Sequence, residues 1–360
     1  MRSVARAAGA LGGPIGSRHY SRKAHEPMDR LKTLRNALLA MLLAAAPAAA
    51  QDKVTYGTDW LAQGEHGGFY QALADGTYAR YGLDVTIVPG GPQAANRALL
   101  ISGKIDFYMG GMISALDSVR AGIPTVTVAA MFQKDPQILM AHPDAGYESF
   151  ADLAGADRII MAKDILVTKF EWMKKNFSGF RDEQYVPYTF NPAPFIADPK
   201  AVQQGYVTSE PFAVEQQGGF EPKVFLFADE GYNAYSTTIE TMQKLVDENP
   251  DLVQRFVDAS IIGWYNYLYG DNTAANALIK RDNPEMTDAQ LAFSRDKLKE
   301  YGIVVSGDAE TRGIGCMTEE RYGDFFGKLV AIGLHEASLD WRKALDTRFV
   351  CKGVGMDLAH

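Results

Sequence analysis

Cysteine is nearly absent from this chain of 360 residues, which has two, Cys316 and Cys351, and no CxxC motif. In an oxidising compartment the two could form a disulfide that holds the C-terminal tail, but they could equally be separate buried thiols. Basic residues are also outnumbered, with 36 Lys and Arg against 44 Asp and Glu. A net charge of −8 does not provide the basic face that a nucleic acid requires, so we expect no nucleic-acid partner.

The signature motifs of several enzyme classes are missing. The chain has no GxSxG nucleophile elbow, no GxxxxGK[ST] phosphate loop and no GxGxxG dinucleotide motif. Residues 323–328 (GDFFGK) have three residues between their glycines, where a phosphate loop has four. His66 has no second histidine at the spacing of a metal site. We therefore expect neither a metal nor a cofactor, and a binding protein rather than an enzyme.

A long hydrophobic run occurs only near the start of the chain. Residues 28–51 read MDRLKTLRNALLAMLLAAAPAAAQ, which is a basic start, an apolar run and an alanine-rich cleavage pattern. This pattern is typical of a secretory signal peptide and is too short for a membrane span. We expect cleavage after Ala50, export to the periplasm, and either Met1 or Met28 as the true start. Without residues 1–50 the net charge becomes −14.

From Lys53 onward, short apolar strands alternate with helices that follow glycine-bearing turns. The alternation of strands and helices predicts an α/β fold with a largely parallel sheet. The predicted strands are residues 53–57, 83–88, 104–110 and 125–132, and the helices between them end at Gly76, Gly103 and Gly122.

A second set of alternating elements begins near Tyr147 and gives way after Tyr232 to a mainly helical region. We predict that residues 51–138 begin a first lobe, that 139–235 form a second lobe, and that 236–360 complete the first and add C-terminal helices. Segments 137–142 and 234–240 are predicted as the connections that act as a hinge. In the second lobe the predicted strands are 157–162, 183–190, 203–210 and 223–228, with a helix over 167–177.

Ligands of open α/β sheets bind beyond the carboxyl ends of the strands. Glycines there let the backbone approach a ligand and expose the amides of helix N-termini. This rule selects four places as candidate ligand sites: Asp59 and Trp60; Gly90 and Gly91; Gly110 and Gly111; and Thr208, Ser209 and Glu210.

Each candidate also has a purely structural interpretation. The glycines could make tight turns, and Trp60 could be a partly buried packing residue. His66 could be a satisfied polar residue at a helix start, and Glu210 is favourable at a helix N-terminus whatever else it does. The tyrosine-rich segment 263–270 is most simply one face of a buried helix.

Several stretches resemble the extracytoplasmic solute-binding proteins of the sulfonate, nitrate and thiamine-pyrimidine-precursor uptake family of ABC transporters. They are TDWLAQGEHGGFY with the YGLDV that follows about twenty residues later, LLISGKIDFYMGG, GIPTVTVAAMF and TSEPF. The resemblance covers most of residues 53–301. It implies a two-lobed periplasmic-binding-protein fold of type II, in which each lobe is a central sheet flanked by helices. Such a protein closes on a small molecule and delivers it to an ABC permease and ATPase; we expect a monomer.

The same family includes fungal enzymes that make the thiamine pyrimidine from a protein histidine and pyridoxal phosphate. Those enzymes carry a lysine and a histidine after GKVD, and a cysteine-rich iron motif. Here Gly110 and Ser114 stand at the first two positions, and residues 229–240 contain no cysteine. The resemblance therefore argues against the enzyme, although Ser114 stays a candidate for ligand contact.

Acidic residues in the predicted loops indicate which solute is bound. Asp59, Glu65 and Glu210 would oppose an anion and suit a neutral or cationic hydrogen-bond donor. A planar aminopyrimidine would stack on Trp60 and donate to Asp59 or Glu210. We therefore predict a nitrogen heterocycle, a thiamine pyrimidine precursor first and a riboflavin-like solute next, with a sulfonate or nitrate as the alternative. A secreted sensor is a further possibility. Additional candidates for the wall of the second lobe and for the hinge are Lys163, Asp164, Tyr188, Phe190, Asn191, Tyr232 and Tyr235.

Overall fold

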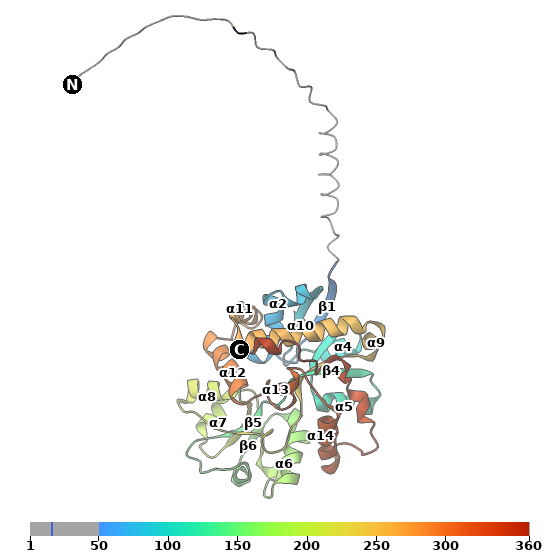
Figure 1. The fold of residues 1–360 in the computed structure, drawn as a ribbon. Coiled ribbons are helices and arrows are strands. Elements are labelled where there is room, and N and C mark those ends of the chain that lie inside the picture. The colour runs from blue at the N-terminus through green and yellow to red at the C-terminus, as the bar shows by residue number, and fades with distance from the viewer. Residues whose placement is uncertain (1–15, 17–49, 360) are drawn as a thin grey trace, which may run out of the picture. The chain divides into compact units, whose positions relative to one another are not determined.

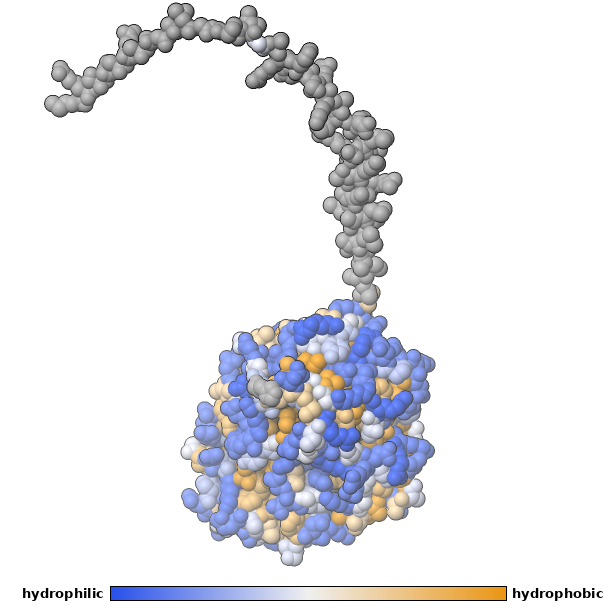
Figure 2. Space-filling model, in the orientation of Figure 1, coloured by the Kyte–Doolittle hydropathy of each residue, from blue (hydrophilic) through white to orange (hydrophobic). Residues whose placement is uncertain are grey.

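The computed structural model describes residue 16 and residues 50–359, except for the side chain of Asp164. The predicted signal peptide therefore lies, apart from Ala50, outside the described residues. Within the described residues no helix is both long and apolar enough to cross a membrane. On the face drawn in Figure 2, hydrophilic residues predominate and hydrophobic residues form small patches.

One five-stranded sheet, sheet A, has the order β2-β1-β3-β10-β4. Strands β1, β2 and β3 are parallel, whereas β10 runs antiparallel to both β3 and β4. The prediction of a largely parallel sheet therefore holds for three neighbouring strands and misses β10. The strands are β1 (Asp52–Gly57), β2 (Leu83–Val88), β3 (Phe107–Gly110), β4 (Thr125–Phe132) and β10 (Ser236–Met242).

The second sheet, sheet B, has the order β7-β6-β8-β5-β9 and repeats the plan of the first. Strands β6, β7 and β8 are parallel, and β5 is antiparallel to β8 and β9. We call sheet A with its helices the first lobe and sheet B with its helices the second lobe (Figure 1). The strands are β5 (Gln137–Ala141), β6 (Ile159–Met161), β7 (Tyr185–Pro187), β8 (Val202–Tyr206) and β9 (Lys223–Leu226).

The predicted positions of the hinge are wrong, because antiparallel strands occupy them. Segments 137–142 and 234–240 were expected to be connections, but the first contains β5 and the second includes most of β10, and both are central strands. A central strand is buried on both faces, so QILMA reads as a plain apolar run without strand alternation. The chain crosses between the sheets just before each strand, at residues 133–136 and 227–235.

Both crossings are held by α14 (Glu319–Ala331). Arg321 donates to the backbone carbonyl of Gln133 in the first crossing and to that of Asn233 in the second. Lys328, two turns later, donates to the carbonyl of Gly231 at 2.8 Å. The two crossings are therefore tied to one helix, and a relative motion of the lobes would pivot beside α14.

The remaining helices surround the two sheets, and α10 is the longest at 20 residues. Figure 1 shows α2, α10 and α11 gathered near β1, and α6, α7 and α8 near β5 and β6. Their bounds are α2 (Gly67–Ala74), α3 (Thr77–Arg80), α4 (Asn96–Ile101), α5 (Met112–Ala121), α6 (Glu171–Asn176), α7 (Ala193–Ala197), α8 (Glu210–Gly218), α9 (Gln243–Glu248), α10 (Pro250–Tyr269), α11 (Thr273–Asp282), α12 (Asp288–Glu300) and α13 (Asp308–Arg312).

Helix α10 supplies the aromatic core of the first lobe. The ring of Phe256 stacks on that of Phe107 with centroids 4.2 Å apart. Trp264 and Tyr267 are fully buried against α2, which confirms the buried-helix interpretation of segment 263–270. A Cβ on Gly68 would lie 2.2 Å from the Trp264 ring, so glycine is required there because the two helices approach closely.

The two cysteines are joined. The sulfur atoms of Cys316 and Cys351 lie 2.03 Å apart, and the bond closes a loop across a sequence separation of 35. Of the two alternatives that the sequence left open, the structure therefore has the disulfide. The bond fixes the C-terminal segment to the residues that precede α14.

Candidate functional site

A cavity of about 380 Å³ lies between loops of the first and second lobes. Its walls come from both sheets, so a solute inside would touch both lobes at once. Among the residues that the structure describes, no Lys or Arg lines it. The first lobe contributes Asp59, Trp60, Gln63, Glu65, His66, Met109, Ser236 and Thr237, and the second lobe contributes Gln137, Ala162, Ile165, Phe190, Gln204, Gly205, Tyr206, Ser209 and Glu210.

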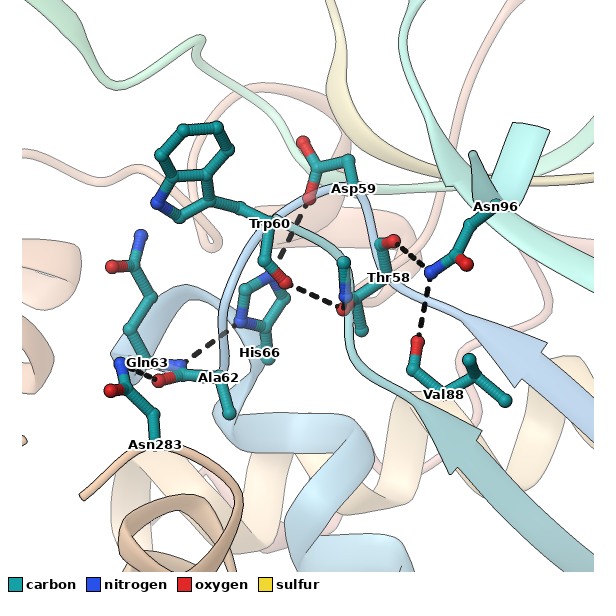
Figure 3. A network of polar contacts seen from close by, with 10 residues as sticks. Thr58, Asp59, Trp60, Ala62, Gln63, His66, Val88, Asn96 and Asn283 are labelled. Carbon is teal, nitrogen blue, oxygen red and sulfur yellow. Dashed lines mark hydrogen bonds and ion pairs between the residues drawn. The ribbon is translucent and has the colours of Figure 1, made fainter. Parts of the chain in front are cut away.

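The turn after β1 is held by a polar network (Figure 3). The Thr58 hydroxyl donates to the Trp60 carbonyl at 2.8 Å and accepts the Gly90 amide at 2.9 Å. The Asn96 side chain donates to the Thr58 carbonyl at 2.8 Å. A Cβ on Gly90 would lie 2.5 Å from the Thr58 carbonyl oxygen. The network therefore fixes the backbone that presents Asp59 and Trp60, and Gly90 serves that packing.

His66 positions the carboxylate of Asp59. The Nδ1 atom of His66 accepts the Gln63 amide at 3.1 Å, so the ring proton must lie on Nε2. Nε2 faces Asp59 Oδ1 at 3.4 Å, as Figure 3 shows. The His66 side chain is 1 % exposed and the Asp59 side chain 42 % exposed. The buried His66 ring therefore contacts one oxygen of Asp59, whose partly exposed side chain lines the cavity.

Glu65 is buried between the lobes. It lies in the single turn Gly64–His66 (η1) and is 2 % exposed. Its Oε1 accepts a hydrogen bond from the Thr208 hydroxyl of the second lobe. Burial raises the pKa of Glu65, and the bond from Thr208 partly offsets that rise.

Glu210 provides a carboxyl group from the second lobe. It begins α8, and its Oε2 accepts the Tyr206 amide at 2.7 Å. Burial raises its pKa to about 7, and the charge of Glu65 adds to that rise, while the Tyr206 amide and the Tyr188 hydroxyl oppose it. Since Glu65 and Glu210 face one cavity, each makes ionisation of the other less favourable.

Two aromatic rings meet across the cavity mouth. Trp60 of the first lobe and Phe190 of the second have ring centroids 5.1 Å apart, with their planes at 38°. The ring of Tyr188 also packs against that of Phe190, with centroids 5.2 Å apart. Phe190 is 55 % exposed and has a φ of 60°, a backbone conformation that L residues rarely adopt. Strained, exposed aromatic residues of this kind occur at ligand-binding loops.

Five of the predicted site residues line this cavity together: Asp59, Trp60, His66, Ser209 and Glu210. Phe190, one of the additional candidates, also lines it. The structure thus brings the turn after β1 and the start of α8 to one place, as the strand-end rule expects.

The other candidates from the first lobe do not line the cavity. Gly91 follows Gly90 in the turn after β2. Gly110 and Gly111 lie at the end of β3, where Ser114 donates to Glu240 Oε1 at 2.9 Å. That carboxyl group is fully buried, with Arg97 3.9 Å away. Ser114, Gly110 and Arg97 therefore surround the buried carboxyl group of Glu240, outside the lining of the cavity.

The other candidates from the second lobe and the crossings have structural partners. Asn191 Oδ1 accepts the Ala193 amide at the start of α7. Tyr232 packs between Trp172 and Phe325. Tyr235 donates to Asp308 at 3.0 Å and lies under the Arg321 guanidinium. Lys163 lies in the turn before α6 but is exposed and outside the lining, and the side chain of Asp164 lies outside the described residues.

Sequence reasoning missed several lining residues, of which three carry a usable signal. Gln137, Gln204 and Tyr206 lie on neighbouring strands, where Gln137 pairs with Tyr206. Gln204 is almost completely buried and accepts the Ala162 amide at 2.6 Å. Polar side chains inside apolar strand segments such as QILMA are the signal that could have identified them. Ser236 and Thr237 gave no such signal, since their place depends on the insertion of β10.

A larger cavity of about 670 Å³ lies at the opposite end of sheet A, near Thr125 and Leu339. Two of its basic residues are in ion pairs, since Lys343 lies 3.6 Å from Asp340 and Arg120 lies 2.7 Å from Asp117. Among the described residues that line it, the aromatic ring is that of His335. We therefore place the candidate site in the smaller cavity. Within the described residues no three metal-binding side chains are arranged to hold a metal ion.

The model of one protein family matches residues 63–273, and its description is NMT1/THI5 like. The chain belongs to the NMT1/THI5-like family. The match runs from the turn after β1 to the start of α11, and so it includes all of the second lobe. The resemblance found in the sequence is thereby confirmed at the level of the family.

Two curated proteins are similar to this NMT1/THI5-like chain. The riboflavin-binding protein RibY of Chloroflexus aurantiacus is 25 % identical over an alignment of 354 residues that covers 91 % of this chain and 99 % of RibY. The 4-amino-5-hydroxymethyl-2-methylpyrimidine phosphate synthase of Schizosaccharomyces pombe is 28 % identical over 104 residues, 29 % of this chain and 30 % of the synthase.

Solved structures confirm the predicted fold class. The alkanesulfonate-binding protein SsuA of Xanthomonas axonopodis pv. citri matches with a TM-score of 0.59 at 14 % identity, over 83 % of this chain and all of SsuA. A Candida albicans protein described as having the generic periplasmic binding protein structural fold matches with a TM-score of 0.54 at 15 % identity, over 83 % and 97 %. At such identities these matches establish the fold and not the ligand.

Proposed function

We propose that this protein is the extracytoplasmic solute-binding component of an ABC importer and that its solute is a planar nitrogen heterocycle. The observation that carries the proposal is the pairing of Trp60 with Phe190 across the cavity, beside carboxyl groups and without a lysine or arginine in the lining. A permease and an ATPase would be its partners and the periplasm its location, as the family resemblance implies.

The aromatic pair favours a flat ligand. Stacked rings lie about 3.5 Å apart, so a planar ligand between Trp60 and Phe190 requires roughly 7 Å between the two rings. The rings are now 5.1 Å apart, and a rotation of Phe190 or a slight opening of the lobes would admit the ligand. Because one ring comes from each lobe, the sandwich forms only when both lobes contact the same solute. Closure would then be favoured by these additional contacts.

The carboxyl groups favour a ligand that donates hydrogen bonds. Asp59, Glu65 and Glu210 all line the cavity. A sulfonate or nitrate would meet these acids with no lysine or arginine in the described lining to neutralise it. The backbone amide of Glu210 at the start of α8, which could bind an anion, already bonds the Glu210 carboxyl. A ring amine or imide N–H would satisfy the acids instead.

Two heterocycles are the leading candidates. A thiamine pyrimidine precursor offers an exocyclic amine for Asp59 or Glu210. Riboflavin offers a larger flat ring, and the relative RibY, described as a riboflavin-binding protein, aligns along almost its whole length. A cavity of about 380 Å³ lies within the size range of small-molecule sites.

An enzyme that uses pyridoxal phosphate is the alternative from another class. In the fungal relatives a lysine would stand at Gly110. A Cβ at Gly110 would lie 2.0 Å from Glu240 Oε1, so the carboxyl group of Glu240 occupies the space of any side chain there. Ser114 and the nearby Arg97 hold Glu240 in place. This arrangement supports binding rather than Schiff-base chemistry.

The test is a calorimetric titration of the exported chain against a panel of solutes. The panel contains riboflavin, 4-amino-5-hydroxymethyl-2-methylpyrimidine, taurine, an alkanesulfonate and nitrate. We expect at least one heterocycle to bind with a Kd of about 1 μM or tighter, near −8 kcal/mol, and the anions not to bind. Tight binding of an anion with no response to either heterocycle would refute the ligand class.

A further inference from the structure

Glu65 makes a contact between the lobes and faces the cavity at the same time. Its Oε1 accepts the hydroxyl of Thr208, which follows β8 in the second lobe. Its Oε2 is buried and has no hydrogen-bond partner within the described part of the chain. A buried carboxyl oxygen without a partner loses its hydration without compensation, so it will favour any donor that enters the cavity.

Thr208 is itself fixed from the other side. It is completely buried, and its carbonyl accepts the Ser294 hydroxyl at 2.7 Å. Ser294 lies on α12, and a Cβ on Gly64 would be 2.5 Å from Ser294 Cβ, so α12 packs directly on the turn that holds Glu65. The chain Ser294–Thr208–Glu65 thus passes between the lobes beside the cavity.

We propose that Glu65 couples capture of the ligand to closure of the lobes, because one oxygen accepts Thr208 and the other accepts an N–H group of the ligand. The inference rests on the proposed function of the cavity and assigns a specific role to a residue that the sequence pattern treated only as an acid. The bond from Thr208 forms only when the lobes are closed, since Thr208 belongs to the opposite lobe. The ligand is thereby a heterocycle with at least one N–H donor directed at Glu65.

The charges around Glu65 are consistent with this role. The titratable groups around it are Asp59, His66, Tyr206, Glu210 and Tyr267. The carboxyl groups of Asp59 and Glu210 oppose its ionisation, and the hydrogen bond from the Thr208 hydroxyl favours it. A ligand N–H would add the hydrogen bond that Oε2 lacks and so favour the ionised form.

A double-mutant cycle on binding tests the coupling. Riboflavin is followed by its fluorescence and 4-amino-5-hydroxymethyl-2-methylpyrimidine by calorimetry. We expect Glu65→Gln to weaken binding about tenfold and Thr208→Val about fivefold. The double variant should bind like Glu65→Gln, because the single amide oxygen of the substituted side chain serves either the ligand or Thr208 but not both. If the two losses instead multiply in the double variant, Glu65 and Thr208 act independently and the proposal is wrong.

The matched control is Thr125→Val. Thr125 is also buried, and its hydroxyl has no partner among the described residues, but it lies at the far end of β4. The Thr125→Val variant should bind the heterocycle with the Kd of the parent. A loss like that of Thr208→Val would show that any buried threonine gives the effect.

Hydrogen exchange in the ligand-free protein separates this inference from the proposed function. Thr208→Val should speed amide exchange about tenfold at residues 64–67 in one lobe and 205–210 in the other, whereas Thr125→Val should not. Unchanged exchange at residues 64–67 would overturn the coupling whatever the protein binds. If the parent binds neither heterocycle but exchange responds as expected, the ligand class fails and the contact between the lobes stands.

Discussion

Replacing Trp60 with alanine is expected to weaken binding of the heterocycle about 10- to 100-fold. Base-on-aromatic stacking is worth about 1–3 kcal/mol per ring by alanine substitution, and each 1.4 kcal/mol is a factor of ten. The effect should lie near the upper end because Phe190 closes on the same solute from the other lobe. Fluorescence titration with riboflavin and calorimetry with the aminopyrimidine measure it.

Two control variants distinguish stacking from a general disturbance. Trp60→Phe keeps a flat ring and should bind within about threefold of the parent. Trp341→Ala removes a tryptophan that stacks on Tyr322, away from the cavity, and should lower stability without changing the Kd. Equal binding by Trp60→Ala and the parent would contradict the stacking role and leave the acids as the main determinants.

Binding of riboflavin is expected to strengthen as the pH rises from 5 to 7 and to level off above pH 8. Burial raises the pKa of Glu210 from 4.5 to about 7, so its carboxyl is mostly protonated at pH 5 in the free protein. A ligand N–H prefers the ionised carboxylate, and the ligand itself does not change charge in this range. If only the ionised form binds, the Kd at pH 5 should be about 50-fold weaker than at pH 7.

The same raised pKa makes the stability of the free protein fall as the pH rises, whereas it makes binding stronger. Between 4.5 and about 7 the folded state holds a proton that the unfolded state has released. The contribution of Glu210 to stability is therefore present below 4.5 and is lost as the pH rises through about 7. The free protein thus loses stability over the range in which binding improves.

The control for the pH profile is Glu210→Gln. An amide oxygen can still accept the Tyr206 amide, which now bonds the carboxylate at 2.7 Å, but the side chain no longer titrates. Calorimetry from pH 5 to 8 should then give a nearly flat Kd. A profile as steep as that of the parent would place the titrating group elsewhere, with Glu65 the first alternative.

Local patterns in the sequence were sufficient for most elements of the first lobe. Residues 53–57, 83–88 and 125–132 form strands close to the predicted bounds, since their apolar runs are flanked by glycine-bearing turns. The strand-end rule then placed Asp59 and Glu210 in one site, although they lie far apart in the chain. Both residues follow a parallel strand, β1 or β8, which is the arrangement that the rule describes.

Features that depend on chain crossing could not be predicted from the sequence. Nothing local in residues 236–242 indicates insertion between β3 and β4, so Ser236 and Thr237 could not be placed at the cavity. Phe190 was one of several aromatic residues in an irregular loop, and its position depends on a positive φ. The contact of Glu65 with Thr208 joins residues 143 positions apart, and no residue pattern marks it.

The insertion of β10 also sets an order of assembly. The strands of sheet B are contiguous in the chain, from Gln137 to Leu226, so sheet B can form as soon as that stretch is available. Sheet A cannot form as early. Strands β3 and β4 do not pair with each other, and β10, which lies between them, comes more than a hundred residues after β4 in the chain. Until β10 arrives, the β3 and β4 edges are unpaired and prone to mispairing. Formation of the turn that carries Trp60 can precede this step, but completion of the binding cavity cannot.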